Sequence, residues 1–487
     1  MSRTDTYDLI LVGTGFASSF FLAEALRRLG KRARILVLER GSRHSHAEYL
    51  RRRGELLRAS LAEAVIPPAD KPWLYLLTFG GSSNCWWANT PRMLPADFEL
   101  RSRFGVGHDW PLRYDDLEEY YCRAEGLMGI AGPPETPLTP RSRPYPQPPH
   151  GLSDPDRLFQ RAYPQLFFPL PSARASQRSR DGRPACCGNG VCGACPTDAK
   201  FTIGNGLAPL YRESRVTLQL EARVDVVDIA GGVARGVRYT QGGRERVASG
   251  DLIALGANAL FNPHVLLRSG MRHPALGRGL VEQLSTYAVV YLAGVDNFQG
   301  STSRCGVGYM LHQDRDRSDR AAGLMLTHNT WDVSGLRPIR EKWRHILGLT
   351  IMFEDLRLNE NLVSLSEHDP LRPVVTFRRR SEYSLKALRS LPSVLDRVLA
   401  PMPVEGFYVF PEPKRTDAHI IGTTVMGNDP KTSVLDRHLV CHNVRNLVAL
   451  GSGAFPTAAP ANPTLTLSAL SLWSAAALFP APARAAS

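Results

Sequence analysis

The chain has 487 residues, a length that predicts two or three domains. Hydrophobic residues make up 43% and charged residues 22% of the sequence, a globular composition that excludes a disordered chain. No run of eighteen apolar residues occurs, so no transmembrane helix is expected. The most apolar segment, residues 465–479, is interrupted by Ser and Thr and predicts a buried core helix.

The net charge of +13 would suit nucleic acid, an anionic membrane surface or an acidic partner. Only seven of the 59 basic residues are Lys, however, and the Arg residues are scattered without a basic, aromatic-rich module. We therefore expect no nucleic acid among the partners. The N-terminus has no signal-peptide pattern. That predicts a cytoplasmic protein, or a periplasmic one exported with a partner that carries the signal.

The first chemical signal is a strand, a glycine turn, a helix and a second strand at the N-terminus. Residues 7–12 are an apolar run that leads into Gly13-Thr14-Gly15-Phe16-Ala17-Ser18 and an amphipathic helix. The second strand, residues 35–38, ends at Glu39. This order is typical of a Rossmann-like dinucleotide site.

Each small or acidic residue of this unit has a predicted task. Gly13 permits the tight turn, and Gly15 lets backbone N–H groups approach a pyrophosphate at the helix N-terminus. Ser18 takes the small position where helix and strand pack closely. Glu39 is placed to accept hydrogen bonds from ribose hydroxyls, and its charge disfavours a 2′-phosphate.

A second loop, residues 79–87, combines glycines, hydroxyls and an amide ahead of a Trp pair. Such a loop would press its backbone against a flat ring system while its polar side chains satisfy the ring edge. The alternative is an ordinary glycine turn before an aromatic core pair. The residues concerned are Gly80, Gly81, Ser82, Ser83 and Asn84.

The C-terminal part carries three further segments: residues 419–427, 446–457 and 461–464. With the two N-terminal motifs, and with residues 110–121, 255–259 and 266–270, they occur in one order from end to end. In that order they resemble the glucose–methanol–choline (GMC) oxidoreductases, FAD-dependent enzymes that oxidise alcohols. The stretch from Gly277 to Leu284 lacks the usual Asn and His of the family pattern, which we interpret as a local change near the flavin domain.

The resemblance implies roles at matching positions. His419 would take the alcohol proton while hydride leaves for flavin N5, with Asn462 as its partner. Other histidines, such as His264 and His273, match no motif position and are expected to be structural. No His occupies residues 82–87, so FAD is expected to be non-covalent. Further cofactor contacts would come from Val224, at adenine, and from Gly451, Ser452, Pro463 and Thr464, at the ribityl chain and pyrimidine edge.

Four of the eight cysteines lie within ten residues: Cys186, Cys187, Cys192 and Cys195. Glycines between them permit turns that would aim several sulfurs inward. The loop resembles the three-iron four-sulfur (3Fe-4S) loop of bacterial FAD-dependent glucose dehydrogenase, although two residues, not three, separate its last two cysteines. Zinc, or a structural loop with thiols or one disulfide, are the alternatives.

The expected fold is mixed α/β, with a Rossmann-like FAD-binding domain and a sheet-and-helix substrate domain, as in the GMC fold. The FAD domain is predicted to be discontinuous. The ranges are 5–125, 196–285 and 415–480 for FAD binding, 126–195 for a Pro-rich excursion with the Cys loop, and 286–414 for substrate binding.

These observations predict an FAD-dependent dehydrogenase acting on a CH–OH group, most simply that of a sugar or polyol. Electrons would leave through the Cys loop to a cytochrome or quinone, and a small export subunit is a further expected partner. An oxygen-using oxidase or a secondary-metabolite tailoring enzyme is the alternative. A non-catalytic flavin-binding electron-transfer subunit is the rival from another class.

Overall fold

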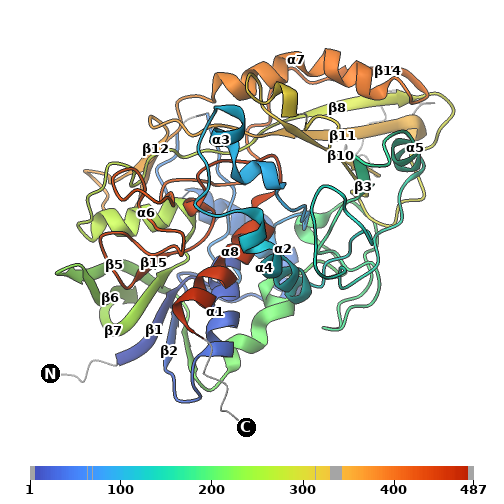
Figure 1. Ribbon diagram of the computed structural model, residues 1–487. Coiled ribbons are helices and arrows are strands. Elements are labelled where there is room, and N and C mark those ends of the chain that lie inside the picture. Colours follow the sequence, from blue (N-terminus) through green and yellow to red (C-terminus); the bar gives the residue numbers. More distant parts are fainter. Residues whose placement is uncertain (1–5, 63, 69, 313, 330–342, 481–487) are drawn as a thin grey trace, which may run out of the picture.

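The computed structural model describes residues 6–480 except 63, 69, 313 and 330–342, and these form two halves, each built on its own sheet (Figure 1). The Rossmann-like half contains the start and the end of the described chain. The antiparallel half lies above it in Figure 1 and is covered by a long helix. This arrangement confirms the predicted mixed α/β class.

The sheet of the Rossmann-like half has seven strands, in the order β4-β2-β1-β7-β6-β5, with β15 beside β7. Strand β1 pairs in parallel with β2 and with β7, so that Leu9 stands opposite Ile35 and Leu252. Its apolar run is buried because helices cover the sheet. The strands are β1 (Thr6–Val12), β2 (Ile35–Leu38), β4 (Val216–Gln219), β5 (Ala222–Ala230), β6 (Val233–Gln241), β7 (Arg244–Leu255) and β15 (Leu447–Ala449).

The C-terminal helix α8 (Pro463–Leu478) packs against α1 (Phe16–Arg28) and α4 (Tyr114–Met128). Its Ser residues and Thr466 are buried, and their hydroxyls find partners: Ser468 and Ser471 donate to carbonyls one turn earlier on the same helix. These bonds explain how a helix with so many hydroxyls sits in the core, as the sequence predicts. The other helices of this half are α2 (His46–Ala62) and α6 (Asn258–Arg268), whereas the short α3 (Leu100–Phe104) lies beside the antiparallel half and its Phe104 contacts Arg317 (Figure 1).

The second sheet is antiparallel and has six strands, in the order β14-β8-β11-β10-β9-β3. Helix α7 (Glu382–Leu399) packs its apolar face on β8, β11 and β14, and α5 (Asp154–Ala162) packs on β3. The strands are β3 (Phe167–Pro169), β8 (Leu284–Leu292), β9 (Gly306–Gly308), β10 (Gly323–His328), β11 (Ile346–Phe353) and β14 (Val404–Val409); β12 (Leu362–Ser364) and β13 (Val374–Thr376) form a separate pair.

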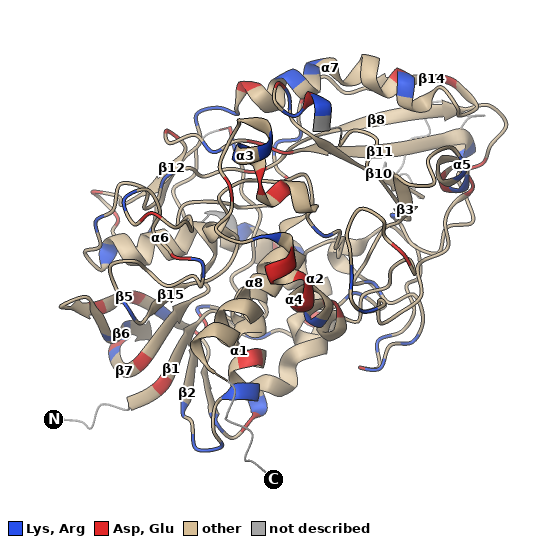
Figure 2. Cartoon of the chain, in the orientation of Figure 1, with Lys and Arg blue, Asp and Glu red and all other residues tan. Residues whose placement is uncertain are grey.

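The Pro-rich stretch 132–150 contains no helix or strand. The residues after it, however, supply α5 and β3 to the antiparallel half, so the excursion takes part in the second sheet. Lys and Arg are spread over both halves and alternate with Asp and Glu (Figure 2). No helix of the described residues has both the length and the apolar character needed to cross a bilayer.

A buried ion cluster connects the two halves. Arg317, between β9 and β10, lies 2.6 Å from Asp97 and 2.6 Å from Glu354, and none of the three side chains is more than 2% exposed. Asp97 adjoins the aromatic core of the Rossmann-like half through Phe98, and Glu354 follows β11. Burial would raise the pKa of Asp97, but Arg317 and His312 hold it lower, at about 2.

We expect Arg317→Leu to lower the free energy of unfolding by about 3–5 kcal/mol, because two buried carboxylates would lose their cation. Urea unfolding measures this change. Arg389→Leu on α7 is the control, since Arg389 and its partner Glu382 are 59% and 61% exposed; we expect a change below about 0.5 kcal/mol. Equal effects of the two substitutions would contradict the role of the cluster.

Candidate active site

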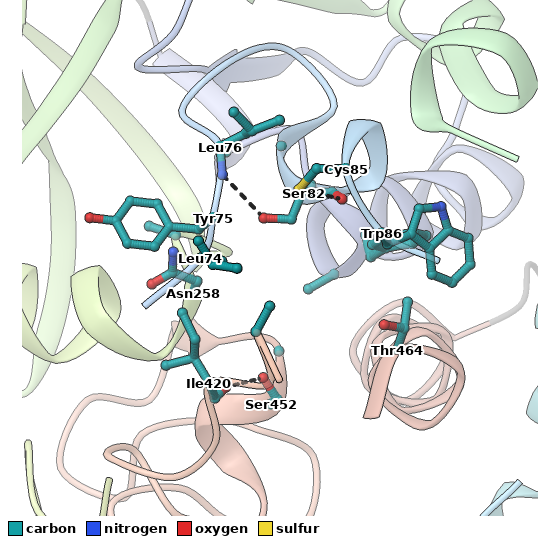
Figure 3. A pocket seen from close by; sticks show the side chains of 18 of the residues that line it. Leu74, Tyr75, Leu76, Ser82, Cys85, Trp86, Asn258, Ile420, Ser452 and Thr464 are labelled. Atoms are coloured by element: carbon teal, nitrogen blue, oxygen red, sulfur yellow. Dashed lines mark hydrogen bonds between the residues drawn. The ribbon is translucent and has the colours of Figure 1, made fainter. Parts of the chain in front are cut away.

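A cavity of about 440 Å³ lies between the two halves and reaches from the N-terminus of α1 to the start of α8. Figure 3 shows part of its lining, with Ser82, Ser452 and Thr464 among the labelled side chains. Segments from the whole length of the chain line it, including the glycine turn, residues 74–78, β8, β11 and the loop that carries His419. Of the predicted site residues, twelve line this cavity: Gly13, Gly15, Glu39, Gly81, Ser82, Val224, His419, Gly451, Ser452, Asn462, Pro463 and Thr464.

The glycine turn between β1 and α1 leaves room where a phosphate would approach. Gly13 has φ +87°, and a Cβ at this position would lie 2.8 Å from the carbonyl oxygen of Gly256. Gly15 has ordinary φ, and a Cβ there would meet no atom within 4 Å. The turn therefore needs Gly13 for its own shape, whereas Gly15 leaves the helix N-terminus open toward the cavity.

Glu39 follows β2 and fastens the glycine turn. One carboxylate oxygen accepts hydrogen bonds from the Thr14 N–H (2.9 Å) and hydroxyl (2.6 Å), and the other accepts from the Gly41 N–H (2.8 Å). Burial raises the pKa of Glu39, and these bonds oppose the shift. The Thr14 hydroxyl in turn accepts from the Gly80 N–H at 2.9 Å, which ties the second loop to the first.

Among the predicted cofactor contacts, four do not line the cavity and instead hold its walls: Ser18, Gly80, Ser83 and Asn84. Ser18 donates to the Val12 carbonyl at 3.0 Å, and a Cβ on Gly256 would collide with its hydroxyl, so helix and strand are in close contact there. Ser83 donates to the carbonyl of Gly80 at 2.6 Å. Asn84 donates to the carbonyls of Phe79 and Gly81, both at 3.0 Å. Of the five residues predicted to bind in the second loop, Gly81 and Ser82 line the cavity.

His419 and Asn462 meet at the far end of the cavity. Asn462 precedes α8, and its Nδ2 lies 3.3 Å from His419 Nε2. On the other side of the ring, His419 Nδ1 lies 3.0 Å from Gln283 Oε1. The Asn462 side chain is buried, and its Oδ1 has no hydrogen-bond partner among the described residues. The imidazole is thus held at both nitrogens, and an acceptor is left for a ligand.

The loop that carries His419 is fastened by Glu282, a residue to which sequence reasoning assigned no role. One Glu282 oxygen accepts from the Thr416 hydroxyl (2.8 Å) and from the backbone N–H groups of Asp417 (2.6 Å) and His419 (3.3 Å). The other oxygen pairs with Lys71. Residues 277–284, the stretch that departs from the family pattern, therefore contact the loop that carries the predicted base.

Burial lowers the pKa of His419, whereas the carboxylates of Asp417 and Glu282 oppose this shift. The imidazole is therefore neutral at neutral pH and able to accept a proton. Burial would raise the pKa of Asp417, but Lys414, 2.7 Å away, holds it below its usual range. Asp417 thus remains a carboxylate near the imidazole and would stabilise its protonated form.

The wall of the cavity near His419 is polar and comes from the antiparallel half. Sequence reasoning missed these residues because they match no local motif and converge only through strand pairing. β8 places Tyr287 opposite Thr350 on β11. The wall consists of Tyr287, Arg304, Thr350, Met352, Lys414 and Asp417.

The Cys loop lies behind the second glycine loop. A Cβ on Gly193 would lie 3.4 Å from the Cys85 carbonyl oxygen and 3.7 Å from Trp87 Nε1, and both residues line the cavity. All eight cysteines are free, and Cys192 Sγ lies 3.0 Å from the Ser303 hydroxyl. In the described part of the chain, no three His, Cys, Asp or Glu side chains are arranged to hold a metal ion.

The glycine turn generates a paired prediction. Gly13→Ala should destabilise the fold and abolish cofactor binding, because the new Cβ would clash at a positive φ. Gly15→Ala should leave the melting temperature of the cofactor-free protein unchanged, yet weaken cofactor binding about 10-fold or more, because its Cβ would occupy the approach of the pyrophosphate. Flavin content and thermal melts measure both; tight flavin binding by Gly15→Ala would contradict the assignment.

The chain is similar to known oxidoreductases. The GMC oxidoreductase family model matches residues 359–471. The fructose dehydrogenase large subunit of Gluconobacter japonicus is 27% identical over 98% of each chain. Paromamine 6′-oxidase of Streptomyces fradiae is 27% identical over 97% of this chain and 91% of its own length. The gluconate 2-dehydrogenase flavoprotein of Pantoea cypripedii is 24% identical over 82% of this chain and 78% of its own.

A solved structure supports the fold independently. Pyridoxine 4-oxidase from Mesorbium loti superposes with a TM-score of 0.67 at 17% identity, over 96% of this chain and 98% of that one. Residues 359–471 therefore match the GMC oxidoreductases, an FAD-binding family, and the chain over most of its length is similar to enzymes named for the oxidation of sugars and alcohols.

Proposed function

We propose that this enzyme oxidises a CH–OH group of a sugar or polyol, with His419 as the general base. The observation that carries the proposal is the pairing of His419 with Asn462 in a cavity that also holds the glycine turn. Bound FAD would supply the hydride acceptor, its N5 atom. Gly15, Gly81 and Ser452 are the residues proposed to line its site, and the open space at Gly15 fits a bound pyrophosphate.

His419 and Asn462 would have different roles at the substrate hydroxyl. His419 accepts the hydroxyl proton, and its lowered pKa keeps it neutral for that purpose. Asn462 has a buried oxygen without a partner among the described residues, and its Nδ2 lies beside the base. The carboxamide would therefore orient the hydroxyl without competing for its proton.

The polar wall near His419 supports a polar, multiply hydroxylated substrate. Tyr287, Thr350, Lys414 and Asp417 offer donors and acceptors on one side of the cavity. Sites of this kind select substrates that satisfy each buried polar group. The names of the relatives point the same way: fructose dehydrogenase, gluconate 2-dehydrogenase and pyranose 2-oxidase all name sugars or sugar acids.

The final electron acceptor is either an external electron carrier or oxygen. We favour a dehydrogenase that delivers electrons to an external cytochrome or quinone, as predicted from the Cys loop. Relatives carry both dehydrogenase and oxidase names, so an oxygen-using oxidase is the second candidate. The thiols of the described residues form no ready ligand set for a metal.

We expect His419→Ala to retain FAD but to reduce it about 10²–10⁴-fold more slowly with substrate, the usual contribution of a general base. Anaerobic stopped-flow absorbance with a panel of sugars and polyols measures this rate. His273→Ala is the matched control, because His273 contacts the Pro430 carbonyl outside the cavity and should leave the rate unchanged. A His419→Ala rate equal to wild type would show that the base is misassigned.

Iron and acid-labile sulfide per FAD, measured on anaerobically purified protein, test the route of the electrons. The predicted 3Fe-4S cluster requires about three irons per FAD and an EPR signal. Iron-free protein with intact FAD would refute the cluster and, with rapid oxygen consumption, favour the oxidase. Flavin that no alcohol in the panel reduces would instead support the non-catalytic electron-transfer subunit.

A further inference from the structure

We propose that Gln283 is a positioning residue that fixes the ring and the tautomer of His419, so that Nε2 presents its lone pair to the substrate. This inference rests on the proposed function, because it assigns a task to a neighbour of the proposed base. Gln283 lies just before β8, in the stretch that departs from the family pattern, and its side chain is fully buried.

The orientation of the Gln283 amide follows from its neighbours. One end of the amide lies 2.8 Å from the Ala459 carbonyl oxygen and 3.1 Å from that of Ala461. Carbonyl oxygens only accept hydrogen bonds, so this end is the NH2 group. The opposite end, 3.0 Å from His419 Nδ1, is therefore the oxygen.

The tautomer of His419 follows in turn. An amide oxygen only accepts, so Nδ1 of the neutral imidazole carries the hydrogen and Nε2 is left unprotonated. The NH2 group of Asn462, 3.3 Å from Nε2, donates to the lone pair of that nitrogen, and a bound substrate hydroxyl would take the place of this long contact. The other tautomer would require the Gln283 amide to turn over, which would set its oxygen against two carbonyl oxygens in a buried position.

The backbone around Gln283 is itself held in place. Arg380 donates to the carbonyls of Glu282 (3.2 Å) and Gln283 (2.9 Å). Ala459 and Ala461 belong to the segment that leads to Asn462 and α8. One amide thus connects the loop of the base to the segment of its partner, and sets their relative position.

The charged groups near the ring do not determine its tautomer. Asp417 and Lys414 lie on the same loop as His419, Glu282 precedes β8, and Lys71 and Arg380 approach from other segments. These groups act on the charge of the imidazole as a whole. Gln283 is the described residue that contacts Nδ1. Its uncharged amide oxygen accepts a hydrogen bond at that nitrogen alone, and therefore decides which nitrogen carries the hydrogen.

Gln283→Met tests the inference, because it keeps the length of the side chain and removes both halves of the amide. We expect flavin reduction to slow about 10- to 100-fold at saturating substrate while FAD content stays intact. The Gln283 oxygen binds the protonated ring more strongly than the neutral one, so its loss should lower the pKa of His419. The acid limb of the rate profile should then move about 0.5–1 toward lower pH.

Gln147→Met is the matched control for the loss of a buried amide. Gln147 donates to the Gly129 carbonyl at 2.9 Å and accepts from the Ser176 N–H at 3.0 Å, and it does not line the cavity. We expect it to leave the reduction rate and the acid limb unchanged. A Gln283→Met enzyme with the wild-type rate and limb would overturn the proposal.

A measurement on the wild-type enzyme needs no stable variant of Gln283. In protein labelled with 15N in histidine, the resonances of His419, assigned by their loss in His419→Asn, should show hydrogen on Nδ1 and none on Nε2 at neutral pH. Hydrogen on Nε2 would overturn the inference. The spectrum requires no substrate, so it stays informative even if the proposed alcohol oxidation fails in the stopped-flow test.

Discussion

The buried carboxylate of Glu282 is the constraint on which the reactive end of the cavity depends. It gathers a hydroxyl and two backbone N–H groups from residues 416–419, and Lys71 and Arg380 balance its charge. This loop belongs to no helix or strand that would define its path. The Glu282 carboxylate supplies the hydrogen bonds that hold it instead. The imidazole carried by the loop is therefore as well positioned as one on a regular element.

A buried carboxylate also holds the loops at the opposite end of the cavity. Glu39 holds the turn at Thr14, and Thr14 holds the second loop at Gly80, so three segments are joined by a chain of short hydrogen bonds. Each end of the cavity is organised by one buried acid that is saturated with donors from the loop it holds. A cofactor that spans the cavity would meet walls already in place, which reduces the ordering that binding requires.

Sequence reasoning found residues whose roles are local. Gly13, Gly15 and Glu39 lie in one βαβ unit, and His419 and Asn462 lie in motifs with a fixed order, so the structure brings these predicted residues to one cavity. Asn84 shows a limit of the method: its amide was predicted to meet a ligand but hydrogen-bonds its own loop. A polar residue in a motif can serve the backbone or the cofactor, and composition does not distinguish the two.

Residues that long-range pairing brings together were beyond sequence reasoning. Gln283 looked like a departure from a pattern, and only the proximity of Ala459 and Ala461 reveals what its amide does. Tyr287 and Thr350 face each other because β8 pairs with β11 across some sixty residues of chain. The contribution of β3 to the second sheet was hidden in the same way, since three residues carry no periodic signal.

The packing of α8 on α1 has a consequence for the synthesis of this protein. Phe21 on α1 meets Phe479 in an edge-on contact of 5.9 Å, so the first helix is covered by nearly the last described residues. Ribosomes add about 5–20 residues per second, and α1 therefore waits roughly 20–90 s for its partner. During that interval its apolar face and the neighbouring strands remain open to aggregation. The first helix of a nascent chain of this architecture therefore lacks its cover until the C-terminal helix has been made.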